Sequence, residues 1–448
     1  MRFSKLILAI YCLLWTCSVF SQDSKFYIQG NASSDKIDFQ LINNLIILPV
    51  VVNDVELSFI LDSGVTKPIL FNILDGFEVL NKQSQETIFL KGLGEGEVVE
   101  AVKSENNIMQ IGDAIKFNQT IFAVYNTGLD YSPKLGIPIH GIIGYDLFKD
   151  FVVEINYSRK HIKLTKHDSY KKKLCNKCEK HDLRFYNNKP YLNAVVTIEE
   201  KEIPINVLID TGASDALWLF EDESKDIVST DNYFEDFLGY GLSGSLYGKR
   251  SKVDVLAIGS YEFSESLVAF PVGASIETLK RIKDRNGTIG AEILKRFHVI
   301  FDYKNSHVIF RKNASFNKDF NYNKSGIDLE HNGFRVVKDY YYTLDNGRLQ
   351  FNTDVTEHIT NIPSSENYRL NVKPAFEVVK IRENSPAKKI GIELGDIILE
   401  VNGKDVKDHT LQEVIEIFSG KDGKKIRLLI ERQQKIFEYT FRLKDMLN

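Results

Sequence analysis

The chain carries one arrangement twice, and this internal repeat limits the folds open to it. An apolar run ends in Asp-Ser-Gly at Asp62, and a second apolar run ends in Asp-Thr-Gly at Asp210. An Ile-Gly pair follows each aspartate, with its glycine 50 residues after Asp62 and 49 residues after Asp210. A second Ile-Gly pair has its glycine 82 residues after Asp62 and 80 residues after Asp210. Matching blocks in the same order at nearly equal spacing indicate a duplication. The sequence therefore predicts two lobes of the same fold.

Short apolar runs bounded by turn-forming residues fill both repeats, which is typical of β-strands. In the first repeat these runs are Leu45–Val52, Ser58–Leu61, Val99–Val102, Ile121–Val124 and Phe151–Ile155. Helical turns are predicted only after the later glycines, at Tyr145–Phe148 and Ala291–Phe297. The predicted fold class is mainly β, with two duplicated β lobes.

Each aspartate stands at the end of an apolar strand, where a charged carboxylate is costly to bury. Two lobes that face each other about a pseudo-twofold axis would bring Asp62 to Asp210. Two carboxyl groups that close share one proton over a wide pH range, because their like charges repel. One of them can accept a proton from water while the other gives one to a carbonyl group. The sequence predicts Asp62 and Asp210 as a catalytic pair.

The small residues after each aspartate have a predicted supporting role. Ser63 and Thr211 carry hydroxyl groups that can hydrogen-bond across the axis. Gly64 and Gly212 permit a tight turn and a close approach of the backbone. We therefore expect these four residues to hold the two strand ends together.

These blocks resemble the aspartic proteases, both the two-lobed pepsin-like members and the single-lobe retroviral members that dimerise. The resemblance covers roughly residues 40–312 and includes the later glycines Gly144 and Gly290. It implies an aspartic-type endopeptidase that uses water as the nucleophile, takes polypeptide substrates, and needs no cofactor and no metal. It places flap hairpins at Lys91–Ala101 and Gly239–Ser251. Because one chain carries both lobes, a monomer is expected.

A second interpretation is a peptide-binding scaffold with the same folds and weak or no catalysis. Val65 stands where the family prefers a small residue, and Ser63 replaces the commoner threonine. The two interpretations differ in what they require. The enzyme needs Asp62 and Asp210 close together, whereas a binding protein tolerates their loss.

After a polar segment, the C-terminal part of the chain resembles a PDZ domain. The motifs that carry this resemblance are Ser385-Pro386-Ala387, Gly391, Gly395-Asp396-Ile397-Ile398 and Val401-Asn402-Gly403, followed by a helix at Leu411–Ser419. PDZ domains bind C-terminal peptides by adding them to a sheet edge. The resemblance implies a carboxylate loop and edge strand at Gly333, Phe334, Arg335 and Val336. A long insertion at 338–372 interrupts the domain, and packing on the lobes without peptide binding is an open alternative.

The first 21 residues have the layout of a secretory signal peptide. Two positive charges precede the apolar run Leu6–Phe20, and Ser21 offers a small residue for cleavage. This run is short for a membrane span. We expect an exported protein, periplasmic or extracellular, with no stable membrane span. The formal net charge of −4 and the lack of a basic patch give nucleic-acid binding no support.

Two cysteines stand outside the predicted signal peptide, at Cys175 and Cys178. Their C-N-K-C spacing beside His167 and His181 is compatible with zinc, but a second ligand pair at metal spacing is missing. A small disulfide or a free pair in a linker is the favoured interpretation.

The predicted domain boundaries follow from these motifs. They are 1–21 for the signal peptide, 22–165 for the first lobe, 166–184 for an interlobe linker with the cysteine pair, 185–313 for the second lobe, 314–326 for a linker and 327–448 for the PDZ-like α+β domain.

Overall fold

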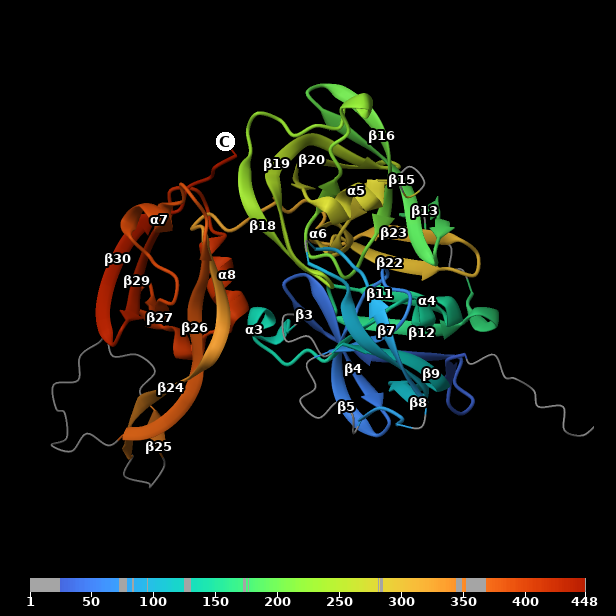
Figure 1. Ribbon diagram of the computed structural model, residues 1–448, viewed down its shortest axis with the longest axis horizontal. Coiled ribbons are helices and arrows are strands. Elements are labelled where there is room, and N and C mark those ends of the chain that lie inside the picture. The colour runs from blue at the N-terminus through green and yellow to red at the C-terminus, as the bar shows by residue number, and fades with distance from the viewer. Residues whose placement is uncertain are drawn as a thin grey trace, which may run out of the picture.

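The structure is a computed structural model that is mainly β, with a few short helices (Figure 1). It describes residues 25–71, 79–82, 84–94, 96–124, 130–171, 175, 177–280, 282, 285–343, 349–351 and 368–447. The predicted signal peptide lies outside the described residues, as do 344–348 and 352–367 of the predicted insertion. In the described part of the chain, no helix is long and apolar enough to cross a membrane.

The first lobe is built on a sheet with the strand order β1-β9-β6-β10-β5-β4-β8-β7, and β3 lies beside β4. Its strands are β1 (Tyr27–Ile28), β3 (Gln40–Ile42), β4 (Leu45–Val52), β5 (Val55–Leu61), β6 (Ile69–Phe71), β7 (Gln85–Leu90), β8 (Val99–Ile111), β9 (Ala114–Val124) and β10 (Gly141–Ile143). β5 is central, antiparallel to β4 and parallel to β10. Central strands of this kind are covered on both faces. This explains why Phe59, Ile60 and Leu61 are all apolar and all buried, without polar alternation.

The second lobe repeats this arrangement in a sheet with the order β14-β15-β16-β21-β17-β20-β19-β18. Its strands are β14 (Arg184–Tyr186), β15 (Lys189–Ile198), β16 (Lys201–Ile209), β17 (Leu217–Leu219), β18 (Phe234–Gly241), β19 (Gly244–Ile258), β20 (Tyr261–Pro271) and β21 (Arg285–Ile289). β16 is antiparallel to β15 and parallel to β21, and β21 is antiparallel to β17. The first lobe has the same three pairings through β4, β5, β10 and β6. Each aspartate therefore follows the central strand of an equivalent sheet.

A third sheet joins the two lobes, with the order β13-β23-β22-β11-β12-β2. Its strands are β2 (Ser34–Asp38), β11 (Phe151–Asn156), β12 (His161–Lys166), β13 (Cys178–Asp182), β22 (Phe297–Asp302) and β23 (His307–Lys312). β11 from the first half of the chain pairs antiparallel with β22 from the second. One hydrophobic core runs through both lobes and this sheet, and it includes Phe148, Phe301 and Tyr303. The two lobes are thus held together by a shared core.

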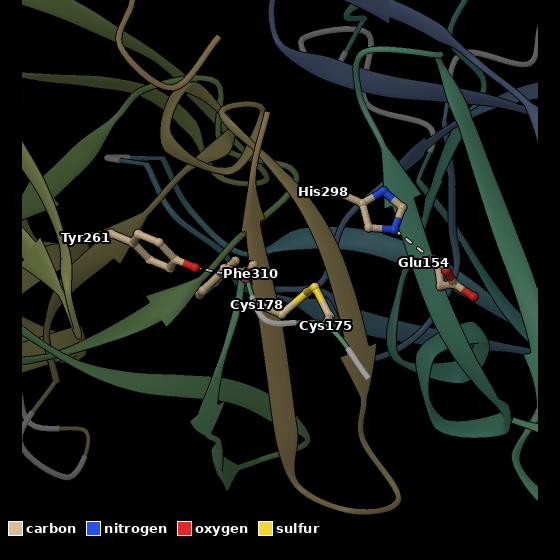
Figure 2. Close-up of a disulfide and its surroundings, with 6 residues drawn as sticks. All are labelled: Glu154, Cys175, Cys178, Tyr261, His298 and Phe310. Carbon is tan, nitrogen blue, oxygen red and sulfur yellow. Dashed lines mark hydrogen bonds and ion pairs between the residues drawn. A yellow bond between two sulfur atoms is a disulfide. The ribbon is translucent and has the colours of Figure 1, made fainter. Parts of the chain in front are cut away.

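The segment predicted as an interlobe linker contributes a strand to this third sheet. Cys178–Asp182 forms β13, which pairs with β23. Cys175 and Cys178 form a disulfide at the start of this strand (Figure 2). An edge strand with few buried apolar residues gives a weak sequence signal, and β13 buries none of its residues fully.

Short helices connect the strands of the lobes. They are α3 (Ser132–Leu135), α4 (Tyr145–Asp150), α5 (Ala274–Lys280) and α6 (Ala291–Leu294), with single 3₁₀ turns at η2 (His167–Ser169) and η3 (Glu223–Lys225). α4 and α6 occupy equivalent places after β10 and β21, as the sequence repeat predicts.

The C-terminal domain is a separate sheet with the order β25-β24-β26-β27-β29-β30 and β28 beside β27. Its elements are β24 (Ile327–Thr343), β25 (Leu349–Phe351), β26 (Tyr368–Ile381), α7 (Pro386–Ile390), β27 (Ile397–Val401), β28 (Lys404–Asp405), η4 (Val406–Asp408), α8 (Leu411–Phe418), β29 (Lys425–Arg432) and β30 (Lys435–Arg442). A capping box of Thr410 and Glu413 begins α8. α8 then buries Leu411, Val414 and Phe418 in the core of this domain. Figure 1 shows the domain, in orange and red, beside the two lobes.

Polar contacts dock the C-terminal domain on both lobes. Asp236 of β18 pairs with Arg382 at 3.1 Å and with Arg250 of its own lobe at 2.8 Å. On the other lobe, the backbone N–H of Asn43 donates to Gln412 Oε1 of α8 at 2.9 Å. The C-terminal domain therefore spans the opening between the lobes.

Candidate functional site

The two Asp-Ser/Thr-Gly turns meet where the lobes face each other. The backbone N–H of Asp62 donates to Ile143 O at 2.8 Å, and that of Asp210 donates to Ile289 O at 2.9 Å. Ile143 is the last residue of β10, which runs parallel to β5, and Ile289 is the last residue of β21, which runs parallel to β16. Each aspartate is thus fixed by the strand beside it, and the structure brings the predicted pair together.

Buried hydroxyl groups link the two turns across the lobe boundary. Ser63 N donates to Thr211 Oγ1 at 3.0 Å, and Thr211 N donates to Ser63 Oγ at 3.1 Å. Each hydroxyl then donates onward, Ser63 Oγ to Ile209 O and Thr211 Oγ1 to Leu61 O, both at 2.7 Å. Both side chains are fully buried. These four hydrogen bonds place the two carboxyl groups at a fixed separation.

Two glycines leave the space that the carboxyl groups occupy. Gly64 N donates to Asp62 Oδ1 at 2.6 Å, and Gly212 N donates to Asp210 Oδ1 at 2.8 Å. A Cβ atom at Gly212 would lie 2.3 Å from Asp62 Cγ, and one at Gly64 would lie 2.9 Å from Asp210 Oδ2. A side chain at either position would therefore push the carboxyl pair apart.

The carboxyl groups of Asp62 and Asp210 are directly coupled. Burial raises the pKa of Asp62 well above its ordinary value, and the charge of Asp210 and a hydrogen bond from it raise it further. A single proton shared between the two groups relieves this repulsion.

Asp62→Asn is expected to stabilise the protein at neutral pH by about 1–2 kcal/mol. A carboxyl group whose pKa is raised on folding contributes stability that is full below its unfolded pKa and is lost as the pH rises through the folded pKa. An amide does not titrate, so the variant should lack this loss. Thermal unfolding at pH 4.5 and pH 8 measures the difference.

Asp38→Asn is the matched control, because the Asp38 side chain is 83% exposed. This variant should leave the unfolding temperature unchanged at both pH values. Equal pH dependence in wild type and Asp62→Asn would contradict the coupling.

Two hairpin tips cover the carboxyl pair. They are the turn between β7 and β8 and the turn between β18 and β19, and both were predicted as flaps. Gly96 N donates to Ser243 O at 2.6 Å, and Ser243 N donates to Leu93 O at 2.8 Å. Gly92 N also donates to Ser243 Oγ at 3.0 Å. The two tips therefore close the cleft by backbone contacts with each other.

The cleft beneath these tips has a volume of about 940 Å³. It contains Asp62 and Asp210 and is walled by apolar side chains, among them Phe71, Leu135, Trp218, Leu238 and Leu246. It extends to the C-terminal domain, where Ile327–Glu330 of β24 and Ile415 of α8 line it. The carboxyl pair and the C-terminal domain therefore face the same space.

Several cleft residues lie outside the sequence predictions. Tyr131 donates to Tyr240 O at 3.4 Å, and burial together with the charge of Asp62 raises its pKa to about 12. Asp215 accepts from Trp218 Nε1 at 2.7 Å and pairs with Arg250 at 3.1 Å. These residues come from loops and a strand edge, and no repeat or motif marks them.

The residues predicted to bind a peptide in the PDZ-like domain lie away from the cleft. Gly333, Phe334, Arg335 and Val336 belong to β24 where it pairs with β26. Phe334 is 70% exposed, and Arg335 pairs with Asp405. Their role in peptide binding stays a prediction.

A hydrogen-bonded turn at Asn323–Ile327 precedes β24. The N–H groups of Ser325 and Gly326 both point to Asn323 Oδ1, at 3.0 and 3.3 Å. Lys324 N donates to Phe418 O at the end of α8. All three N–H groups therefore have acceptors within the chain, and the turn ties the start of β24 to the end of α8. The left-handed Gly326 within Lys-Ser-Gly-Ile is the sequence signal that could have located it.

In the residues that the structure describes, no group of three or more His, Cys, Asp or Glu side chains is placed to hold a metal ion. Cys175 and Cys178 are bonded to each other, so neither offers a thiolate ligand.

Comparison with known proteins gives one family match and several relatives. Residues 377–432 match the family model described as PDZ domain. A "Probable CtpA-like serine protease" of Staphylococcus saprophyticus is 30% identical over 92 residues, 20% of this chain and 18% of that protein. The "Carboxy-terminal processing protease CtpA" of Bacillus subtilis is 26% identical over 156 residues, 30% of this chain and 32% of that protein. The chain spans about a fifth to a third of the length of the curated relatives it matches.

These relatives contradict the predicted exported aspartic endopeptidase. Proteins from two Staphylococcus species that match this chain are named serine proteases, so the prediction of an aspartic-type protease is wrong. The physical reason is that the duplicated Asp-Ser/Thr-Gly turns determine where two carboxyl groups lie, whereas the reaction of a site depends on more than its fold.

Serine-type catalysis needs a base beside the serine hydroxyl. Lys249 Nζ lies 3.0 Å from Ser229 Oγ, and the same amine pairs with Glu221 at 3.0 Å. Burial raises the pKa of Glu221, but hydrogen bonds from Lys249 and Ser229 lower it below its ordinary value. Glu221 therefore contacts both the amine of Lys249 and the backbone N–H of Ser229. The comparisons thus identify one part of the chain by family: its C-terminal domain is a PDZ domain.

Proposed function

We propose that this chain is an exported polypeptide-binding protein whose interlobe cleft and PDZ domain hold one extended polypeptide. The observation that carries the proposal is the lining of the cleft. Asp62 and Asp210 form one part of it, and Ile327–Glu330 with Ile415 of the PDZ domain form another. PDZ domains bind extended peptides at a strand edge. A peptide bound at this strand edge would extend into the space above the carboxyl pair, because both line the same cleft.

The carboxyl pair suits a peptide group. A peptide offers one C=O acceptor and one N–H donor, and a pair that shares one proton offers one donor and free acceptor oxygens. Ser63, Gly64, Thr211 and Gly212 support the pair in this role by fixing its position. Apolar walls on both sides of the pair provide sites for alternate side chains of an extended chain.

We further propose that the two lobes are of the acid-protease type and that the chain acts as a monomer. Two observations support this proposal. Both lobes have the same strand pairing, and the hydroxyl groups of Ser63 and Thr211 each accept a hydrogen bond from the other lobe. The predicted leader at 1–21 supports export, and the boundaries at 313 and 327 agree with the end of β23 at Lys312 and the start of β24 at Ile327.

Binding of an unfolded chain tests the proposal. The probe is fluorescein-labelled, carboxymethylated lactalbumin, titrated with the chain lacking residues 1–21 and followed by anisotropy. We expect saturable binding that weakens at least tenfold in Asp62→Ala, because the variant loses the shared-proton pair. Asp38→Ala, far from the cleft, should bind as wild type does. No saturable binding, or equal binding by Asp62→Ala, would overturn the proposal.

The same incubation reports whether the bound chain is cut. Samples taken over hours are separated by mass, with and without a reagent that modifies reactive serines. Cleavage abolished by the reagent would extend the relatives' serine-type activity to this chain. Cleavage that resists the reagent but disappears in Asp62→Asn would place the chemistry at the carboxyl pair.

A further inference from the structure

A segment of the first lobe lies against the part of the PDZ domain where a peptide would add. β24 pairs with β26 along one edge. In the described part of the chain, β25 reaches the other edge only at Tyr341–Thr343. The edge from Ile327 onward lies beside α8, and an open strand edge of this kind can accept a peptide as an added strand. We call this space the β24–α8 groove.

The segment Asp130–Gly136, which contains α3, occupies the approach to the β24–α8 groove. α3 packs directly against β24, and Figure 1 shows it between the PDZ domain and the first lobe. At the end of the segment, a Cβ atom on Gly136 would lie 3.3 Å from Leu411 Cβ at the start of α8. The segment thus touches both walls of the groove.

The same segment reaches the flap of the second lobe. The amine of Lys134 lies 2.6 Å from the centre of the Tyr240 ring, and Tyr131 donates to Tyr240 O at 3.4 Å. Tyr240 belongs to β18, close to the tip that meets Gly96. The segment is therefore in contact with the groove and with the flap at once.

Charge indicates which peptide competes with this segment. Glu330 of β24 attracts Lys134, although burial lowers the pKa of that lysine to about 8. Glu330 lies on β24, three residues after Ile327. A peptide strand that adds to this edge of β24 would pass beside Glu330. A basic residue there would replace Lys134.

We propose that Asp130–Gly136 is an internal competitor for the β24–α8 groove. A peptide that adds to the edge of β24 with a basic residue beside Glu330 displaces it and so releases the flap contacts of Tyr131 and Lys134. This rests on the proposed peptide binding by the PDZ domain. Occupation of the groove thereby opens the cleft above the carboxyl pair.

A reversible cross-link tests the competition. Gly136→Cys combined with Leu411→Cys places two Cβ atoms close to the 3.5–4.5 Å that a disulfide requires. The oxidised and reduced forms carry the same two substitutions, so the strain at left-handed Gly136 and the loss of the buried Leu411 side chain affect both forms equally. The probes are fluorescent decapeptides ending in Lys-Ala-Val or Glu-Ala-Val, each with a free carboxylate. We expect the reduced double variant to bind the lysine probe at least tenfold more tightly than the oxidised form, and more tightly than the glutamate probe. Wild type under the same reductant controls for reduction of the Cys175–Cys178 disulfide.

A second readout separates this inference from the proposed function. Hydrogen exchange at Gly92–Gly94 and Gly241–Gly244 should accelerate when the lysine probe is added to the reduced form, and should not change in the oxidised form. Equal probe binding by both forms, or no binding by either, would overturn the competition. Lactalbumin binding by the reduced form is measured in parallel, and its loss would instead overturn the proposed function.

Discussion

Thr211→Val is expected to lower the free energy of unfolding by about 3–5 kcal/mol. Valine has the shape of threonine, so the loss comes from hydrogen bonding and not from packing. Ser63 N and Leu61 O would both lose their partner at the centre of a fully buried contact. Each buried group left unpaired costs about 1–3 kcal/mol. Chemical denaturation of the wild type and of Thr211→Val, followed by tryptophan fluorescence, measures the change in the free energy of unfolding.

Thr165→Val is the matched control for this substitution. Thr165 is 5% exposed, and its hydroxyl has no hydrogen-bond partner. Removing that hydroxyl should therefore leave stability unchanged or raise it slightly. Ser63→Ala combined with Thr211→Val should cost less than the sum of the single changes, because each hydroxyl depends on the other turn. Additive effects, or equal losses of stability from Thr211→Val and Thr165→Val, would show that the hydrogen bonds between Ser63 and Thr211 do not depend on one another.

Asp236→Ala is expected to weaken the docking of the PDZ domain by about 3–5 kcal/mol. Asp236 lies between Arg250 and Arg382, and all three side chains are at most 11% exposed. Without the carboxylate, the two buried guanidinium groups repel each other, and Asp215 beside Arg250 and the carbonyl of Asn323 beside Arg382 remain as their partners. We expect the PDZ domain to unfold in a separate, earlier calorimetric transition and the molecule to expand in small-angle scattering. Asp226→Ala breaks an exposed ion pair with Lys201 and should change neither.

The pH dependence of this docking follows from two carboxyl groups. Burial raises the pKa of Asp236, but Arg382 and Arg250 outweigh it and hold the pKa below its ordinary value. Its contribution is therefore present above the unfolded pKa and lost as the pH falls through the folded one. Burial and the charge of Asp236 raise the pKa of neighbouring Asp328 to about 6, so its contribution is lost as the pH rises through 6. The temperature of the wild-type PDZ transition should therefore be highest in mildly acidic solution. A transition temperature that does not change between pH 3 and pH 8 would contradict this.

The sequence by itself determined the duplication, the mainly β class and the PDZ domain. Each of these rests on local patterns: an apolar central strand, a turn of small residues, or a capped helix such as α8. Asp62 and Asp210 could be paired in advance because the repeat implies an axis, and residues in equivalent positions meet at an axis. The activity class did not follow, because the same carboxyl pair serves a binding site as well as a reaction, and the relatives are named serine proteases.

Only the tertiary structure decided how the three parts meet. The contact of Lys134 with Tyr240, the ion pair of Asp236 with Arg382, and the place of α3 beside β24 join residues that are more than a hundred positions apart. Such contacts have no period and no motif, because they depend on how rigid units dock. The Asn323–Ile327 turn was missed for a related reason: its converging N–H groups are a property of backbone shape, which a polar, asparagine-rich stretch does not reveal.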